Sequence, residues 1–284
     1  MALFSHLRRA FRPAQEAPAA EADVACPVCQ ATAPFLAGVD FNKSCEEARG
    51  LRLPPSGLTV RYHLCDRCGF CFAPELYTWS FERFERQIYN DDYAKVDPDY
   101  KRERPLANAG LVDQLFGSAK VSHLDYGGGS GLLSETLRQK GWNSRSYDPF
   151  VDRDVSVAEL GKFELVTAFE VFEHVPDIGA LFQDLRTLVG PDGVILFSTL
   201  LSDGEIARGR ALGWWYASPR NGHISLFSKD SLRLSLNKAG FSHASASANL
   251  HLAYGRVPAW AVHVLGPSQG QADSEEPVDR QVPD

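Results

Sequence analysis

Residues 125–131 read Asp-Tyr-Gly-Gly-Gly-Ser-Gly, which places an acid and four glycines between a short apolar segment and a helical segment. Glycine loses more conformational entropy on folding than any other residue, so this density indicates backbone conformations or close approaches that other residues do not allow. The flanking patterns predict a strand over 121–127 and a helix over 131–141. We therefore expect a strand, a tight turn and a helix.

The same alternation continues toward the C-terminus. Further strands are expected over 142–150, from 163 onward, and over 194–200, 243–255 and 259–265. Helices are expected over 177–193 and 228–241, the second capped by Ser228. Strands that alternate with helices predict an α/β fold with a Rossmann-like, doubly wound, mostly parallel sheet covered on both faces.

Composition and charge argue against some classes of function. The 284 residues are 44% hydrophobic and carry a formal net charge of −7, which does not favour general nucleic-acid binding. No apolar run approaches the roughly 18 residues of a membrane span. With no export signal, we expect a cytoplasmic protein with a disordered leader over 1–22 and a disordered acidic tail over 267–284. An amphipathic surface helix is the alternative for the leader.

All six cysteines lie in the first quarter of the chain, and four of them form two CxxC hooks: Cys26, Cys29, Cys65 and Cys68. Four thiolates suit a tetrahedral, structural zinc ion with no open position for catalysis. Free buried cysteines or a redox pair are the alternative. Cys45 and Cys71 fit as small hydrophobic residues, although either is able to replace a ligand.

The hooks define a small zinc-ribbon-like module over 23–78. Its long insert between the hooks must form additional turns or strands, with a strand leading into the second hook at 54–64. Helical patterns over 79–93 and 106–117 predict a helical connector over 79–117, followed by the α/β domain over 118–266.

The glycine loop distinguishes between two cofactors. The dinucleotide fingerprint GxGxxG lacks its third glycine, because Leu132 stands in that position. The spacing Asp125-x-Gly127-x-Gly129-x-Gly131 instead resembles motif I of class I S-adenosylmethionine-dependent methyltransferases. That cofactor has no pyrophosphate but carries an ammonium group, which suits bare backbone beside a carboxylate.

Further segments extend the resemblance to about residues 105–245. Asp148 ends the second strand, where the family uses an acid to hold the ribose hydroxyls; a turn or helix-cap role is the alternative. Residues 163–177 resemble the fourth-strand segment, with Glu170 expected at the cofactor, and 188–199 resemble the turn and fifth strand. The segment after Asp148 is short and does not fix which residue contacts adenine; Asp154 and Val155 are the candidates.

Two segments offer residues for the chemistry. His223 is a candidate general base for an acceptor hydroxyl, and Trp214, Trp215 and Tyr216 are candidates for stacking on a sugar or aromatic acceptor. A loop histidine and a lid packed on the core are the alternatives. The resemblance also suggests a magnesium-type site as in ubiquinone-biosynthesis O-methyltransferases, made here by four residues: Glu170, Glu173, His174 and His223.

We therefore expect a methyltransferase that acts on a small acceptor, with His223, His174 and Tyr216 as catalytic candidates. O-methylation of a sugar or another hydroxyl-bearing metabolite is the favoured reaction. A C- or N-methyltransferase of a natural-product or nucleotide-sugar pathway, a non-catalytic zinc-module binding protein with a degenerate cofactor fold, and a nicotinamide-dependent oxidoreductase are the alternatives.

Overall fold

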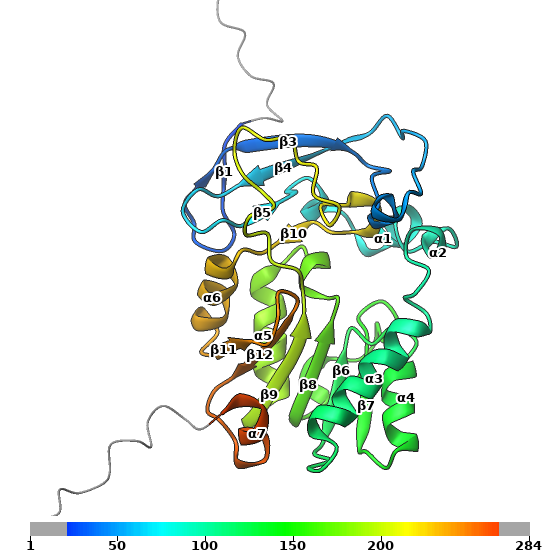
Figure 1. The fold of residues 1–284 in the computed structure, drawn as a ribbon, viewed down its shortest axis with the longest axis vertical. Coiled ribbons are helices and arrows are strands. Elements are labelled where there is room, and N and C mark those ends of the chain that lie inside the picture. The colour runs from blue at the N-terminus through cyan, green and yellow to red at the C-terminus, as the bar shows by residue number, and fades with distance from the viewer. Residues whose placement is uncertain (1–21, 267–284) are drawn as a thin grey trace, which may run out of the picture.

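A computed structural model describes residues 22–266, so the predictions for the leader and the acidic tail lie almost wholly outside the described residues. The larger part of the molecule is built on a six-stranded sheet in the order β11-β12-β9-β8-β6-β7 (Figure 1). Its parallel strands are β6 (His123–Tyr126), β7 (Ser144–Tyr147), β8 (Phe163–Phe169) and β9 (Val189–Ser198). The antiparallel edge is β12 (Leu250–Tyr254) and β11 (Ser242–Ser245).

Helices cover both faces of this sheet, on opposite sides of it in Figure 1. The helices α3 (Glu103–Phe116) and α4 (Leu132–Gln139) pack on one face, and α5 (Ile178–Leu188) and α6 (Lys229–Lys238) pack on the other. Successive residues of β8 serve the two faces: Leu165 packs with the first pair of helices and Val166 with the second. The predicted doubly wound α/β fold is confirmed.

Two helix starts follow from local sequence. The Asp177 carboxylate accepts a hydrogen bond from the amide of Ala180 at 2.9 Å and caps α5. Ser228 and Ser231 exchange side-chain-to-backbone hydrogen bonds in a capping box at the start of α6, which confirms the predicted Ser228 cap.

The last predicted strand is wrong. Residues 259–265 form the 3-10 helix η7 (Ala259–Ala261) and the short helix α7 (Val262–Leu265). The edge of the sheet is already taken by β11, and this segment packs instead on α3, where Trp260 meets Phe116 edge-on with ring centroids 5.6 Å apart. The segment over 243–255, expected to be one strand, is the hairpin β11–β12.

The connector also differs in detail. The helix expected over 79–93 is divided into α1 (Phe81–Gln87) and α2 (Tyr93–Val96). Asn90 lies between them, and its side-chain oxygen accepts the amide of Asp92 at 3.1 Å, a local turn that interrupts the helix. The next helix, α3, begins at Glu103, three residues before the predicted 106.

The cysteine-rich part is a small β module, drawn at the top of Figure 1. It contains a hairpin of β1 (Val24–Ala25) and β2 (Thr32–Ala33), and a four-stranded sheet in the order β10-β5-β4-β3. The strands of that sheet are β3 (Phe35–Asp40), β4 (Thr59–Leu64), β5 (Cys71–Phe72) and β10 (Ser225–Leu226). Short 3-10 helices follow β3 and β5, namely η2 (Cys45–Arg49) and η3 (Leu76–Thr78).

One strand of the module sheet comes from the far end of the chain. After β9 the chain rises from the large sheet onto the module, where β10 pairs antiparallel with β5 (Figure 1). Tyr62 of β4 and Trp214 and Leu226 of this returning segment share one buried cluster. Another buried cluster contains both Phe70 of the module and Leu124 of the large sheet, so the two parts share core packing. In the part of the chain that the structure describes, no helix combines the length and apolarity needed for a membrane span. The expected cytoplasmic location stays a prediction.

Candidate active site

The glycine loop lies where β6 ends and α4 begins. Gly127, Gly129 and Gly131 have φ values of +75°, +54° and +78°, in the left-handed region that favours glycine. The amides of Gly127 and Gly128 donate to the carbonyl of Tyr147 at 2.8 and 3.2 Å, which ties the loop to the end of β7. The density of glycine therefore has a backbone cause.

The space around the loop is unevenly filled. A Cβ on Gly127 would lie 2.6 Å from the side chain of Val171, and one on Gly128 would lie 2.2 Å from Ser146. A Cβ on Gly129 would meet nothing within 4 Å. A bare backbone that faces open space is what the predicted cofactor loop requires.

Asp125 lies beneath this loop at the end of β6. Its carboxylate is 4% exposed and accepts a hydrogen bond from the Thr167 hydroxyl at 2.7 Å. Burial raises the pKa of Asp125 to about 7, with a smaller contribution from the charge of Asp148.

Asp148 lies at the edge of the loop. One carboxylate oxygen accepts the amide of Gly129 at 2.9 Å, and the other accepts the amide of Phe150 at 2.8 Å. The structure thus brings Asp148 to the glycine loop, and its ribose contact stays a prediction. Asp154 and Val155 are exposed, and their adenine contact also stays a prediction.

A cavity of about 560 Å³ lies at the carboxyl ends of β8 and β9. Glu170 follows β8 directly and adopts a φ of +53°, which is uncommon for a residue other than glycine. Its amide donates to Ser198 Oγ at 2.9 Å, and that hydroxyl donates back to Glu170 Oε1 at 2.8 Å. Glu170 and its neighbour Val171, which contacts Gly127, link this cavity to the glycine loop.

Three more of the predicted residues meet beside the cavity, which is lined by the two histidines among them. Glu173, His174 and His223 bring one possible ligand atom each to within 4.8 Å of one another. The Tyr216 hydroxyl donates to Glu173 Oε1 at 2.5 Å, while Glu173 Oε2 is buried without a hydrogen-bond partner among the described residues. The rings of His174 and His223 lie edge to face, with centroids 4.9 Å apart.

Burial controls the charge of this cluster. It lowers the pKa of His174 to about 4, and it lowers the pKa of His223 well below the usual value, with a further contribution from His174. Burial and the charge of Glu170 raise the pKa of Glu173 well above the usual range. Both imidazoles are therefore neutral at pH 7 and able to accept a proton or bind a metal ion.

The cluster fits a divalent metal ion only in part. The unpartnered Glu173 oxygen and the two neutral imidazoles are suitable ligands, but Glu170 does not belong to this group of atoms. Two imidazoles with one carboxylate suit zinc or iron better than magnesium, which prefers oxygen. The metal ion stays a prediction.

The three aromatic residues of the lid differ in exposure. Trp214 and Tyr216 are buried and pack on one another with ring centroids 5.2 Å apart. Trp215 is 41% exposed and lines the cavity, so among the three it has the free surface for stacking on an acceptor.

Several residues of the cavity wall were not expected from the sequence. They come from the module, the connector and the β11–β12 hairpin: Cys45, Glu46, Arg49, Asp97, Asp99, Arg104, Asn108, Ser247 and Asn249. Arg104 forms two hydrogen bonds with the Asp97 carboxylate at 3.0 and 2.7 Å, and Arg49 reaches Asp99 at 3.0 Å. No local motif marks these residues, because the wall is assembled from segments far apart in sequence.

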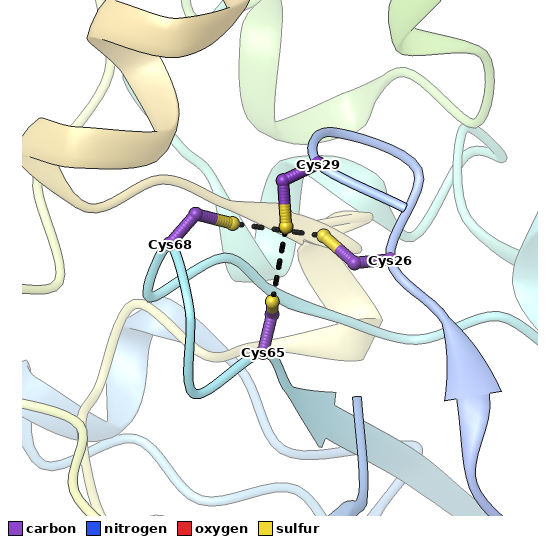
Figure 2. Close-up of side chains that lie close together, drawn as sticks. All are labelled: Cys26, Cys29, Cys65 and Cys68. Carbon is purple, nitrogen blue, oxygen red and sulfur yellow. Dashed lines mark hydrogen bonds between the residues drawn. The ribbon is translucent and has the colours of Figure 1, made fainter. Parts of the chain in front are cut away.

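The four hook cysteines converge at one point of the module, as Figure 2 shows. Cys26 Sγ lies 3.6 Å from Cys68 Sγ, and Cys29 Sγ lies 3.4 Å from Cys65 Sγ. Zinc–sulfur bonds of about 2.3 Å in a tetrahedron place the sulfurs about 3.8 Å apart, close to these distances. The four cysteines therefore fit a zinc ion, whereas Cys45 and Cys71 lie outside the group.

Known proteins resemble the part of the chain that forms the large sheet and its helices. A family model described as a methyltransferase domain matches residues 100–246. A ubiquinone biosynthesis O-methyltransferase from Colwellia psychrerythraea is 31% identical over 112 residues, which cover 31% of this chain and 46% of that protein. The protein of the same name from Idiomarina loihiensis is 32% identical over 133 residues, covering 36% of this chain and 53% of that protein. The chain spans about half the length of these curated relatives.

Solved structures of methyltransferases align with somewhat more than half of this chain. Human N-acetylserotonin methyltransferase in complex with S-adenosylmethionine gives a TM-score of 0.44 at 15% identity, covering 63% of each chain. Mitomycin 7-O-methyltransferase gives a TM-score of 0.42 at 15% identity, covering 62% of this chain and 60% of that one. The family model matches more than half of the chain, over the sheet that carries the glycine loop. The chain therefore belongs to the methyltransferase domain family, in its class I, S-adenosylmethionine-dependent branch.

Proposed function

We propose that this protein transfers the methyl group of S-adenosylmethionine to a hydroxyl group of a small polar acceptor, a sugar or another hydroxyl-bearing metabolite. The observation that carries the proposal is a polar cavity of about 560 Å³, which is lined by two neutral histidines and by Glu170, whose neighbour Val171 lies against Gly127 of the glycine loop. Relatives named O-methyltransferases support oxygen as the acceptor atom.

The cofactor would be held by two carboxylates and the open backbone between them. Asp125 suits the ammonium group, Asp148 suits the ribose hydroxyls, and Gly129 leaves the space between them free. When bound, the cofactor supplies an electrophilic methyl group, and the protein positions the acceptor in line with it. Glu170 extends the same edge toward the cavity.

His223 is the best candidate for the acceptor's proton. Its Nδ1 lies 2.8 Å from the carbonyl of Tyr216, so the tautomer with a proton on Nδ1 satisfies that contact and leaves the Nε2 lone pair free. Burial keeps this imidazole neutral at pH 7. It also makes His223 a weak base, so proton removal would accompany methyl transfer rather than precede it.

The cavity lining favours a polar acceptor over a hydrocarbon. Asn108, Ser247 and Asn249 offer hydrogen bonds, and Trp215 offers an exposed aromatic face. An aromatic face beside amides and hydroxyls suits the alternating apolar and polar surfaces of a sugar ring.

One observation favours a second candidate, N-methylation of an amine. Four acids line the cavity against two arginines: Glu46, Asp97, Asp99 and Glu170 against Arg49 and Arg104. An excess of carboxylates attracts a cationic acceptor. We therefore include amino sugars and other small amines among the acceptors to be tested.

We also propose that the four cysteines hold a structural zinc ion. The sulfur–sulfur distances and the burial of three of the four residues support a closed site without catalytic function.

The function is tested in two stages. Calorimetry compares S-adenosylhomocysteine with NAD, and we expect binding of the first alone. Transfer of a labelled methyl group is then measured with neutral sugars, amino sugars and catechols. Methyl label on a sugar hydroxyl, formed by the wild type and absent with His223→Ala, supports the proposal. Label on an amine supports the second candidate. Binding of NAD would overturn both.

A further inference from the structure

The segment between β9 and α6, residues 200–227, carries most of the candidate residues for the acceptor. It includes Trp215, Tyr216 and His223, and we call it the crossover segment. It begins at the carboxyl end of β9, passes over the module and returns to the large sheet at α6 (Figure 1). Of its residues, 214–224 form part of the cavity wall and its immediate support.

The module holds the end of this segment by main-chain contacts. Leu226 of β10 pairs with Cys71 of β5, and the amide of Ala73 donates to the carbonyl of Ile224 at 2.9 Å. The hydroxyl of Tyr62 in β4 donates to the carbonyl of His223 at 2.7 Å. The backbone position of the candidate base is therefore set by the module.

A lysine holds the middle of the segment. Lys43 lies between β3 and η2, and its Nζ donates to the carbonyls of Trp214 and Ala217, both at 2.5 Å. Its own carbonyl accepts the amide of Arg220 at 3.2 Å. The side chain is partly buried, and this burial lowers the pKa of Lys43 to about 8. Lys43 thus donates hydrogen bonds to backbone carbonyls on both sides of Trp215.

The cysteine hooks anchor this arrangement. Cys65 follows β4 directly, and Cys68 lies just before β5, so the second hook joins the two strands that contact the crossover segment. The carbonyl of Cys68 accepts the Ser228 hydroxyl at 2.6 Å, at the point where the segment enters α6. A metal ion on the four sulfurs would lock the register of β4 and β5.

The glycine loop and Asp148, which we call the cofactor half of the site, are held by other hydrogen bonds. The hydrogen bonds of the glycine loop run to Tyr147 and Asp148, which belong to the large sheet and the turn after it. The hydrogen bonds that hold the glycine loop therefore end in the large sheet, whereas those that hold the crossover segment end in the module.

We propose that the cysteine module is a positioning device for the acceptor half of the active site, acting on His223 and Trp215 through Lys43, and that the cofactor half does not depend on it. The proposed function enters only through the term "acceptor half". The proposal itself states that the order of the crossover segment depends on the module, and this is testable without knowledge of the acceptor.

Hydrogen exchange on the full, zinc-loaded chain tests this dependence. Lys43→Met replaces the apolar stem of the side chain with one of similar size but removes the ammonium group and therefore both hydrogen bonds. We expect the amides of residues 212–224 to exchange at least tenfold faster in this variant. Those of 123–131 should be unchanged, zinc content retained, and the affinity for S-adenosylhomocysteine within twofold of the wild type.

Lys162→Met is the matched control. Lys162 Nζ also donates to two carbonyls, of Thr187 and Val189 at 3.1 and 3.4 Å, but at the opposite end of the sheet strands. We expect no change in residues 212–224 in this variant. A chelated wild-type sample should reproduce the effect of Lys43→Met and recover when zinc is restored.

Two results would overturn the proposal. One is unchanged exchange of 212–224 in Lys43→Met, and the other is an equal loss of order at 123–131 with weaker cofactor binding. Should chelation unfold the whole chain, Lys43→Met still decides the question, because it leaves the four sulfurs in place. Neither readout needs turnover, so a failed acceptor search leaves this test intact.

Discussion

Individual residues of the glycine loop differ in what they tolerate. Gly127 and Gly128 are closed in by Val171 and Ser146, whereas Gly129 faces open space. The positive φ of Gly129 and the space beside it have separate consequences, since the first affects folding and the second affects the ligand. Matched variants separate the two effects.

Gly129→Arg should abolish cofactor binding. The side chain would enter the space next to Asp148, so we expect the affinity for S-adenosylhomocysteine to fall at least about 100-fold, roughly 3 kcal/mol. Gly161→Arg is the control, because Gly161 also has a positive φ with nothing near its Cβ position but lies outside the loop. Calorimetry on both variants measures the difference, and wild-type affinity in Gly129→Arg would contradict the site.

Asp125 predicts a pH dependence of cofactor binding. Its pKa of about 7 means that the carboxyl is mostly protonated at pH 6 and mostly ionised at pH 8. A bound ammonium group favours the ionised form, so S-adenosylhomocysteine should bind up to about tenfold more tightly at pH 8 than at pH 6. Titrations at the two pH values measure this, and Asp125→Asn should remove the difference. Binding that weakens from pH 6 to pH 8 would refute the role.

The same carboxyl affects stability with the opposite sign. Its pKa in the folded protein lies above the unfolded value of 3.8, so the folded state binds the proton more strongly. Its contribution to stability is therefore complete below about pH 4 and is lost as the pH rises toward 7.

At the scale of elements, the two cysteine hooks are built alike but not from the same residues. Gly69 follows the second hook with a φ of +70°, and Gln30 occupies the corresponding position of the first hook with a φ of +63°. The amides of both donate to the carbonyl of the first cysteine of their hook, at 2.8 and 2.9 Å. The first hook thus stores strain that the second avoids.

Gln30→Gly should stabilise the module. Removing a side chain from a left-handed position gains about 1 kcal/mol, or roughly 2–4 °C in Tm for a domain of this size. Gly69→Ala is the opposite case, because its Cβ would lie 2.7 Å from Ser228 Oγ, and should lower Tm. Thermal unfolding of both zinc-loaded variants measures the effects. A lower Tm for Gln30→Gly would argue against strain in the first hook.

At the scale of the whole molecule, the module and the large sheet share one site. The module supplies Glu46 and Arg49 to the cavity, the connector supplies Asp99 and Arg104, and the large sheet supplies Glu170. The cavity therefore lies where the module, the connector and the large sheet meet, although the sequence pattern describes these three parts separately.

The zinc proposal has a stoichiometric consequence. We expect one zinc ion per chain, and Cys65→Ser should lose it and destabilise the module, since the remaining sulfurs leave the tetrahedron incomplete. Cys71→Ser is the control, because Cys71 is equally buried but lies outside the group of four sulfurs. Elemental analysis of both variants decides this. A folded wild-type protein without zinc would contradict the assignment.

The sequence by itself determined the elements whose cause is local. The acid–glycine spacing, the Ser228 cap and the strand–helix alternation each depend on neighbouring residues, and the structure has all three. The CxxC spacing likewise indicated which four of the six cysteines meet, because each hook is a local turn.

Only the tertiary structure decided what surrounds the acceptor cavity and how the chain ends. Residues 259–265 carry an apolar pattern that fits a strand, but the sheet edge was occupied and the segment coiled onto α3. The contacts of Lys43 with Ala217, of Arg49 with Asp99 and of Arg104 with Asp97 have no signal in the neighbouring sequence, because they join residues that are seven to 174 positions apart. Long-range packing chooses such partners, and a pattern read along the chain contains only short-range information.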